Sequence, residues 1–144
     1  MQQSVARLVA IVALAIGLAA CSSLRLDGVN LDGTSWRAVS VAGTAPAPGH
    51  EPTLVFDGGK VRGDAGCNGY TGQEPATIVD GRLDIGETLT TLGGCVDEHG
   101  QTTAWGALEP VFMRLLTGGN SIAFRGTELV VSSTGGELVF ERAP

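Results

Sequence analysis

The sequence has 144 residues, enough for one domain of ordinary size but not for two. Its hydrophobic share of 43% excludes wholesale disorder, and its 22 glycines follow no G-X-Y period, which excludes collagen. With 9 basic and 15 acidic residues the formal net charge is −6, so we expect no nucleic-acid binding through a basic surface.

The N-terminal residues have the pattern of an export signal. Arg7 precedes an unbroken apolar stretch, Leu8–Ala20. A helix of that length would rise about 20 Å, which is too short for a hydrocarbon core of about 30 Å and fits the apolar region of a signal peptide. We therefore predict that residues 1–20 are removed. The loss of Arg7 lowers the net charge of the mature chain from −6 to −7.

The end of this stretch reads Leu18-Ala19-Ala20-Cys21 and resembles the bacterial lipobox. The resemblance implies cleavage before Cys21 and attachment of membrane lipid to its thiol. Two or three acyl chains would hold the protein stably, on the exported side of the cell membrane or outer membrane. Ser22 in place of aspartate resembles an outer-membrane sorting signal of two-membrane bacteria. The alternative is an ordinary secretory signal with an incidental cysteine.

We expect residues 21–32 to be the lipidated N-terminus with a short tether and residues 33–144 to form one domain. From Gly33 onward turn signals recur about every 8–12 residues, the spacing of a sandwich or barrel. Apolar and β-branched runs between these turns predict short strands at 36–41, 53–56, 60–64, 77–79, 82–85, 121–124, 129–132 and 137–140.

Residues 103–116 follow a different period. Their apolar positions recur in steps of three and four, which indicates one helical stripe packed against a sheet. Pro110 lies inside the stripe, so we expect a kink or two short pieces. Thr117-Gly118-Gly119 is expected to end the helix.

Two cysteines remain once Cys21 is assigned to lipid. An even pair, Cys67 and Cys95, in an oxidising compartment favours a disulfide. The bond would close a loop of about 29 residues and contribute roughly 3–4 kcal/mol in the chain-entropy model. Two free buried thiols, or cysteines with a catalytic or metal-binding role, remain the alternatives.

The loop Gly66-Cys67-Asn68-Gly69-Tyr70, followed by Cys95, resembles the META domain of HslJ-like bacterial lipoproteins. Supporting stretches lie at 31–36, 54–56, 61–64, 88–92, 129–131 and 138–140, so that the resemblance covers about residues 31–141. Leu92, where many relatives carry methionine, and Pro110 depart from the pattern.

The resemblance implies a mainly β (α+β) fold. The expected architecture is a small curled antiparallel sheet or incomplete β-barrel of about eight short strands, with one helix in the C-terminal half packed on it. The family is exported or surface-associated and linked to envelope stress and secretion. It brings no established reaction, so no catalytic residue is transferred.

The residues of the Cys67 loop also have structural interpretations. Gly66 and Gly69 allow sharp turns on both sides of Cys67. Asn68 can bond its own backbone or adopt a left-handed conformation, and Tyr70 can cap an edge of the core.

No constellation of residues indicates catalysis or a metal site. A cysteine nucleophile needs a base, and His50 and His99 lie in loops without motif spacing. Cys67 and Cys95 with these histidines lack the ligand spacing of zinc sites. Lys60 and Arg62 fit a solvated strand edge. We expect no enzyme, metal or cofactor.

The favoured function is that of a membrane-anchored, non-catalytic META-type lipoprotein of the envelope. It would act in stress response, secretion, binding or scaffolding, as a monomer, with an envelope protein as a possible partner. The alternative is a carrier of a small apolar or lipid ligand between sheet and helix, which a core filled by Trp36, Phe56, Phe112 and Phe124 would argue against. A third class, a cysteine-dependent enzyme, requires free thiols at Cys67 and Cys95.

Overall fold

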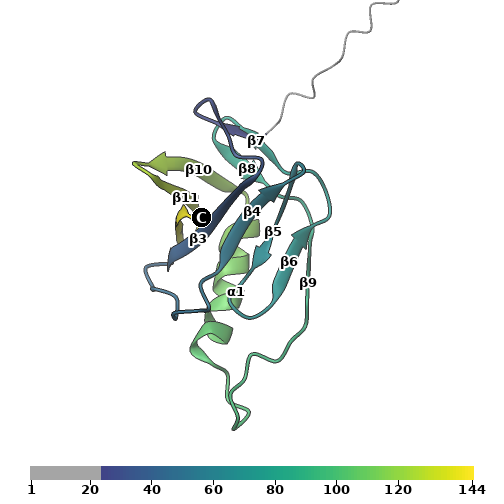
Figure 1. The fold of residues 1–144 in the computed structure, drawn as a ribbon, viewed down its shortest axis with the longest axis vertical. Helices are drawn as coiled ribbons and strands as arrows, with labels where there is room; N and C mark the ends of the chain where they lie inside the picture. Colours follow the sequence, from purple (N-terminus) through teal and green to yellow (C-terminus); the bar gives the residue numbers. More distant parts are fainter. Residues whose placement is uncertain (1–23) are drawn as a thin grey trace, which may run out of the picture.

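A computed structural model describes residues 24–144 of the chain. The predicted signal peptide, residues 1–20, and the predicted lipidation site, Cys21, lie outside the described residues. The elements, shown in Figure 1, are β1 (Arg25–Leu26), β2 (Val29–Asn30), β3 (Thr34–Val41), β4 (Thr53–Asp57), β5 (Lys60–Asp64), β6 (Gly69–Gly72), β7 (Thr77–Val79), β8 (Arg82–Asp84), β9 (Thr88–Thr90), α1 (Ala104–Thr117), β10 (Asn120–Arg125), β11 (Glu128–Ser133) and β12 (Gly136–Arg142).

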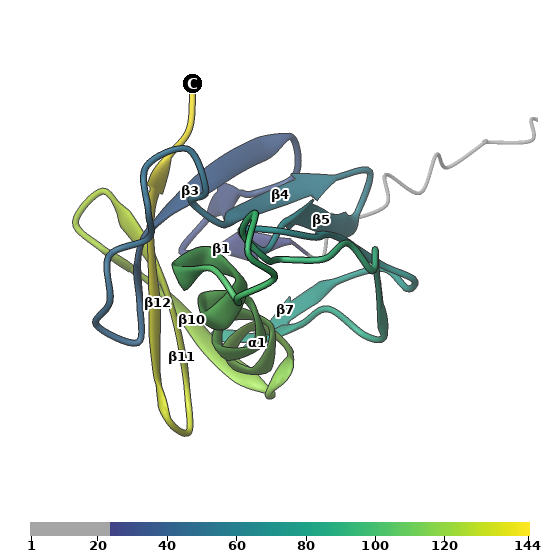
Figure 2. The same cartoon turned by 90° about the horizontal axis from the view of Figure 1, so that it is seen from below.

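Ten of these strands form one antiparallel sheet in the order β7-β8-β10-β11-β12-β3-β4-β5-β6-β9. The sheet curls into a half-barrel around α1, which Figure 2 shows nearly end-on. The predicted fold is thereby confirmed, and each of the eight predicted strands is present. The sheet also contains β6 and β9, which were not predicted. β6 starts and ends in glycine, a residue that is depleted in strands.

The middle of the sheet joins the two ends of the domain. β3 pairs with β12 from Leu138↔Val41 to Arg142↔Trp36, with a shift of register between Val139 and Phe140. On its other side β3 pairs with β4. A strand near the N-terminus therefore lies between a neighbour in sequence and the last strand of the chain.

The region expected to be a tether is folded from Leu24 onward. β1 and β2 pair as a two-stranded ribbon, and the Leu31 N–H donates a hydrogen bond to the Leu24 carbonyl at 2.9 Å. Leu24, Leu26 and Leu31 are buried in the core. The Asp32 carboxylate accepts a hydrogen bond from the Gly59 N–H at 3.0 Å, which ties the ribbon to the β4–β5 turn. The folded domain thus begins ahead of residue 33.

The helix is a single element from Ala104 to Thr117, so of the two expected outcomes, a kink or two short pieces, the second is wrong. Pro110 cannot donate the backbone hydrogen bond to the Gly106 carbonyl, and its ring lies on the exposed side. Phe112, Leu115 and Leu116 are buried beyond it. Packing of an apolar face supplies most of a helix's stability in proteins, which outweighs the missing bond here.

Aromatic side chains fill the space between the sheet and the helix. Phe56, Phe112 and Phe140 are fully buried there. The Phe112 ring lies 5.9 Å from that of Tyr70 and 6.2 Å from that of Phe140, between ring centroids. Of the other rings expected in the core, Trp36 is buried and Phe124 packs against the core while partly exposed. This filling weighs against a carrier with a ligand cavity at that place. Within residues 24–144, no helix combines the length and apolar composition that a membrane crossing requires.

Candidate functional site

A disulfide joins Cys67 and Cys95, whose Cα atoms are 5.8 Å apart, and the predicted bond is confirmed. Cys67 lies in the loop between β5 and β6, and Cys95 lies in the segment that leads from β9 to α1. The bond therefore fastens the segment before the helix to the β5–β6 connection. Neither sulfur is a free thiol. Both alternatives, two free buried thiols and cysteines with a catalytic or metal-binding role, required free thiols.

Asn68, which is 5% exposed, is the centre of a polar cluster beside this disulfide. We call the cluster the Asn68 junction and define it as Asn68, Thr91, Gly93, Glu109 and the Cys67–Cys95 bond. The Asn68 backbone N–H donates to Glu109 Oε2 at 2.8 Å, and its Nδ2 donates to Glu109 Oε1 at 2.9 Å. Its Oδ1 accepts from the Gly93 N–H and from Thr91 Oγ1. One amide thus joins three separate segments.

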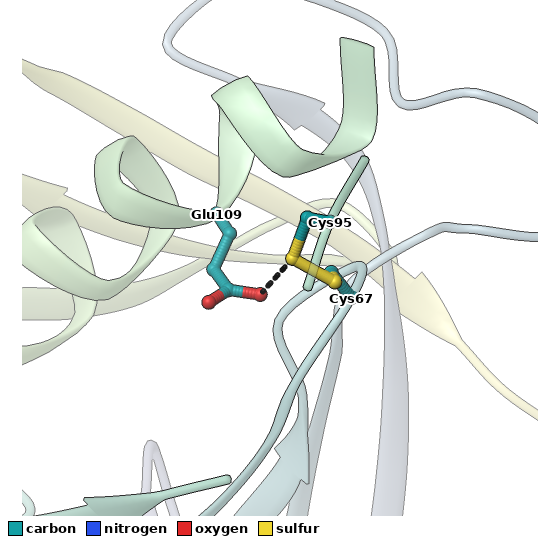
Figure 3. A group of neighbouring side chains, drawn as sticks. All are labelled: Cys67, Cys95 and Glu109. Atoms are coloured by element: carbon teal, nitrogen blue, oxygen red, sulfur yellow. Dashed lines mark hydrogen bonds between the residues drawn. A yellow bond between two sulfur atoms is a disulfide. The ribbon is translucent and has the colours of Figure 1, made fainter. Parts of the chain in front are cut away.

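Glu109 approaches the disulfide from the helix, as Figure 3 shows. Its Oε2 lies 3.9 Å from Cys95 Sγ, and this is a contact rather than a donated bond because a disulfide sulfur carries no proton. The two sulfurs and the carboxylate lie within 4.8 Å of one another, which brings together donor atoms of the kind that metals use. Sulfur binds metal as thiolate, so the intact disulfide does not offer such ligands.

The start of the helix is built onto Cys95. Thr103 is the N-cap: its Oγ1 accepts from the Gly106 N–H at 3.1 Å and donates to the Cys95 carbonyl at 3.1 Å. The Thr103 N–H donates to the same carbonyl at 3.0 Å. A Cβ atom on Gly106 would lie 2.5 Å from the Cys95 Cβ, so only glycine allows this close approach.

Gly66 and His50 connect the junction to the loop between β3 and β4. Gly66 has φ +106°, in the region that favours glycine, as predicted for a sharp turn before Cys67. Its carbonyl lies 3.3 Å from His50 Nδ1, and the His50 ring stacks on Trp105 with centroids 4.0 Å apart and planes at 5°. Gly69, expected to turn after Cys67, instead begins β6 without a positive φ.

Tyr70 lies inside the core, not at its edge as expected. It is 2% exposed, and its hydroxyl donates to the Thr53 carbonyl at 2.7 Å. Burial raises the pKa of the Tyr70 phenol well above its ordinary value, and the negative charge of Asp64 adds to the shift. The phenol therefore acts as a neutral donor that fixes β6 against β4.

The structure brings Gly66, Cys67, Asn68 and Cys95 to one place but gives Asn68 a different role from the predicted one. Asn68 has no positive φ, and its amide bonds to distant segments. Glu109, Thr91 and Gly93 were not among the predicted site residues. Glu109 is 41 residues from Asn68. A single acidic residue in a helix does not indicate a hydrogen bond to so distant a partner.

A shallow hollow of about 650 Å³ lies on the outer side of the sheet, across β4, β5, β6 and β9. Val55, Arg62, Thr71 and Leu89 face one another in register along its floor. Arg62 forms an ion pair with Asp57 at 3.1 Å, and β5 lies between two strands, so Lys60 and Arg62 do not mark a strand edge as expected. Leu89 is 64% exposed.

The fold and the junction define a small disulfide-bonded half-barrel domain with one helix. The model of the META domain family matches residues 29–144, and the chain belongs to the META domain family.

Two solved structures share the fold. One, an NMR structure of a protein, is 17% identical with a TM-score of 0.62, over 77% of this chain and 90% of its own. The other, an NMR structure of a protein from Burkholderia xenovorans, is 27% identical with a TM-score of 0.58, over 78% of this chain and 83% of its own. A search of the curated proteins found no match.

Proposed function

We propose that this chain is an exported lipoprotein, anchored to a membrane by lipid on Cys21, whose META domain acts as a non-catalytic binding or scaffold module of the envelope. The observation that carries the proposal is the Leu18-Ala19-Ala20-Cys21 sequence at the end of an apolar stretch. It stands directly ahead of a domain whose buried core begins at Leu24. A cysteine between the apolar stretch and the folded domain can carry the lipid, and a lipid anchor of two or three chains holds a protein without a membrane-spanning helix.

The disulfide supports the exported location, because such bonds persist in oxidising compartments and are rare in the cytosol. It also supports a non-catalytic role, since a bonded sulfur is not a thiolate nucleophile. His99 Nε2 lies 3.5 Å from Glu98 on an exposed loop, in an arrangement that orients no nucleophile.

Exposed apolar side chains around the outer hollow support an envelope protein as the partner. Leu89 and Val55 both line the hollow, and Leu89 is 64% exposed. Neighbouring apolar groups at a surface, rimmed by polar ones, are typical of protein–protein contacts. A carrier role receives less support, because Phe56, Phe112 and Phe140 occupy the space where its ligand would bind.

Metabolic labelling tests the anchor. Cells that express the full chain are grown with radiolabelled palmitate, and the wild type and Ser22→Ala are expected to carry label. Cys21→Ala is expected to carry none, although Cys67 and Cys95 remain. Equal labelling of the Cys21→Ala variant would refute the lipid anchor.

Capture from envelope extract tests the binding role. The lipidated wild type is expected to retain a protein that Leu89→Asp loses. Thr127→Asp, an exposed change in the β10–β11 turn, serves as the control and is expected to retain it. The same protein bound equally by all three would contradict the use of the outer hollow. A thiol titration of the native lipoprotein should find no free thiol at Cys67 or Cys95.

A further inference from the structure

The chain between the proposed anchor and the folded domain is very short. Leu24 is fully buried, and its carbonyl is already hydrogen-bonded to Leu31 within the ribbon. Only Ser22 and Ser23 separate it from Cys21. Because extended chain spans at most about 3.3–3.6 Å per residue, the Cα atoms of Cys21 and Leu24 are never more than about 11 Å apart.

Most of this length lies within the headgroup region of the membrane. The headgroup region adds roughly 5–8 Å to each side of the hydrocarbon core, and the lipid on a cysteine begins at the inner boundary of that region. A connection of about 11 Å therefore reaches little further than the outer surface of the headgroups. The part of the domain around Leu24 cannot move away from the bilayer or turn freely above it.

We propose that the end of the domain formed by β1, β2 and the β4–β5 turn rests on the lipid headgroups, while the loop between β9 and α1 points away from the membrane. Figure 1 shows this arrangement: the β1–β2 ribbon lies at the top, where the chain enters the domain, and the β9–α1 loop lies at the bottom. The inference rests on the proposed lipidation of Cys21. It adds the lipid surface as a partner of particular described residues.

The chemistry of this end fits a bilayer surface held there by the anchor. Val29 on β2 is 43% exposed, and the nearby cations Arg25 and Lys60 make hydrogen bonds only to the carbonyls of Gly28 and Gln73 among the bonds of the described residues. Asp27, Asp32 and Asp57 lie at the same end, so charges of both signs face the headgroups. The contact of this end with the headgroups should therefore depend on the length of the chain between Cys21 and Leu24 and only weakly on salt concentration.

The opposite end of the domain then faces away from the membrane. Leu92 and Val96, which are 96% and 52% exposed, belong to the segment between β9 and α1. The Asn68 junction holds that segment through Gly93 and Cys95. An envelope protein bound at the outer hollow would lie beside this segment, because Thr91 lines the hollow.

Photo-crosslinking tests the orientation. The photoreactive residue p-benzoylphenylalanine replaces Val29 in one lipoprotein and Leu92 in another, both reconstituted into phosphatidylethanolamine–phosphatidylglycerol vesicles with radiolabelled phospholipid. Both sites carry apolar side chains, and Leu92 is the more exposed of the two, so exposure alone would favour crosslinking from position 92. Crosslinking to phospholipid is expected to be several-fold stronger from position 29 than from position 92, and unchanged by added salt.

A longer connection supplies the second arm. A ten-residue Gly-Ser insertion between Ser23 and Leu24 raises the root-mean-square span to about 20 Å, so the difference between the two positions should shrink markedly. Equal crosslinking from both positions without the insertion, in protein shown by mass spectrometry to carry lipid, would overturn the orientation and leave the anchor standing. Protein without lipid on Cys21 would overturn both.

Discussion

The two halves of α1 are held in the domain by different forces. Beyond Pro110, Phe112, Leu115 and Leu116 pack into the apolar core. Ahead of Pro110 no residue of the helix is fully buried: Leu108 packs partly against the core, and the Trp105 ring stacks on His50. Directional contacts add to this weaker packing, namely the Thr103 cap, the bonds between Glu109 and Asn68, and the disulfide at Cys95, which Gly106 approaches closely.

The difference shows how a glycine-rich domain fixes α1, the one helix among the described residues. Apolar packing is non-directional, so it selects which face of the second half turns to the core but does not fix individual atoms. Hydrogen bonds and a disulfide have defined geometry, so they set the position of the first half. Loss of a core residue should therefore destabilise the whole domain, whereas loss of a junction residue should loosen one end of it.

The largest effect is expected for Phe112→Ala. Phe112 is fully buried between Tyr70 and Phe140, and large-to-small changes of this kind cost about 3–5 kcal/mol. Chemical denaturation should show this loss of unfolding free energy. Met113→Ala, at a partly buried neighbour, should cost clearly less. Equal losses would mean that the core does not hold the second half of α1.

Removal of the disulfide should cause the second-largest loss of unfolding free energy. The double variant Cys67→Ser/Cys95→Ser is expected to lose roughly 3–4 kcal/mol of unfolding free energy, because its unfolded chain gains the entropy of an open loop. Hydrogen exchange should rise in residues 104–109 more than in residues 112–117. Reductant should lower the stability of the wild type to that of the variant and leave the variant unchanged. Uniform exchange along the helix would contradict the division into two halves.

Glu109→Ala probes the junction alone. The change removes the carboxylate that accepts from the Asn68 backbone N–H and from Nδ2, and among the described residues Nδ2 keeps only the Gly93 carbonyl at 3.4 Å as an oxygen acceptor. An unsatisfied backbone N–H of this kind costs about 1–3 kcal/mol. Glu98→Ala is the matched control, because that side chain is 86% exposed. Thermal or chemical unfolding should separate the two variants. The junction has no energetic role if they unfold alike.

Tyr70→Phe should have the smallest effect at neutral pH, about 1 kcal/mol for the lost hydrogen bond to Thr53. Burial raises the pKa of Tyr70 in the folded protein above the value of about 10 in the unfolded chain. The neutral phenol is therefore favoured by folding, and its contribution is complete below pH about 10 and is lost above it as the unfolded chain ionises.

Tyr70 is the single tyrosine of the chain, so this titration is readily isolated. Unfolding free energy measured across the alkaline range should fall more steeply in the wild type than in Tyr70→Phe. Parallel curves would show that the phenol is not held neutral by burial.

The fold was predictable from local patterns wherever strands alternate and turns carry glycine. Strands such as β6 that were not predicted depend on tertiary contacts. A Cβ on Gly72 of β6 would lie 3.1 Å from the Ile85 carbonyl, and no local sequence pattern shows this constraint. The same reason applies to Pro110, whose local penalty is outweighed by the burial of Phe112.

The site was predictable only in part. Cys67 and Cys95 could be paired because they are the two cysteines left after Cys21 and because an exported chain lies in an oxidising compartment. The turn at Gly66 could be predicted from glycine itself. The partners of Asn68 lie 23 to 41 residues away, so their roles depend on how the sheet brings segments together. A prediction from its neighbours alone gave the Asn68 side chain a bond to its own backbone or a left-handed conformation, whereas its amide bonds to distant segments and its φ is not positive.

The pairing of β3 with β12 also determines when this protein can fold. Leu138 to Arg142, almost the last residues of the chain, form the partner of β3 in the middle of the sheet. Contacts so distant in sequence form late and slowly, because the whole intervening chain must first be brought together. The half-barrel therefore cannot close before residues 138–142 have been made. If the chain is exported as proposed, this late closure would keep it unfolded during its passage, and the half-barrel would assemble on the far side of the membrane.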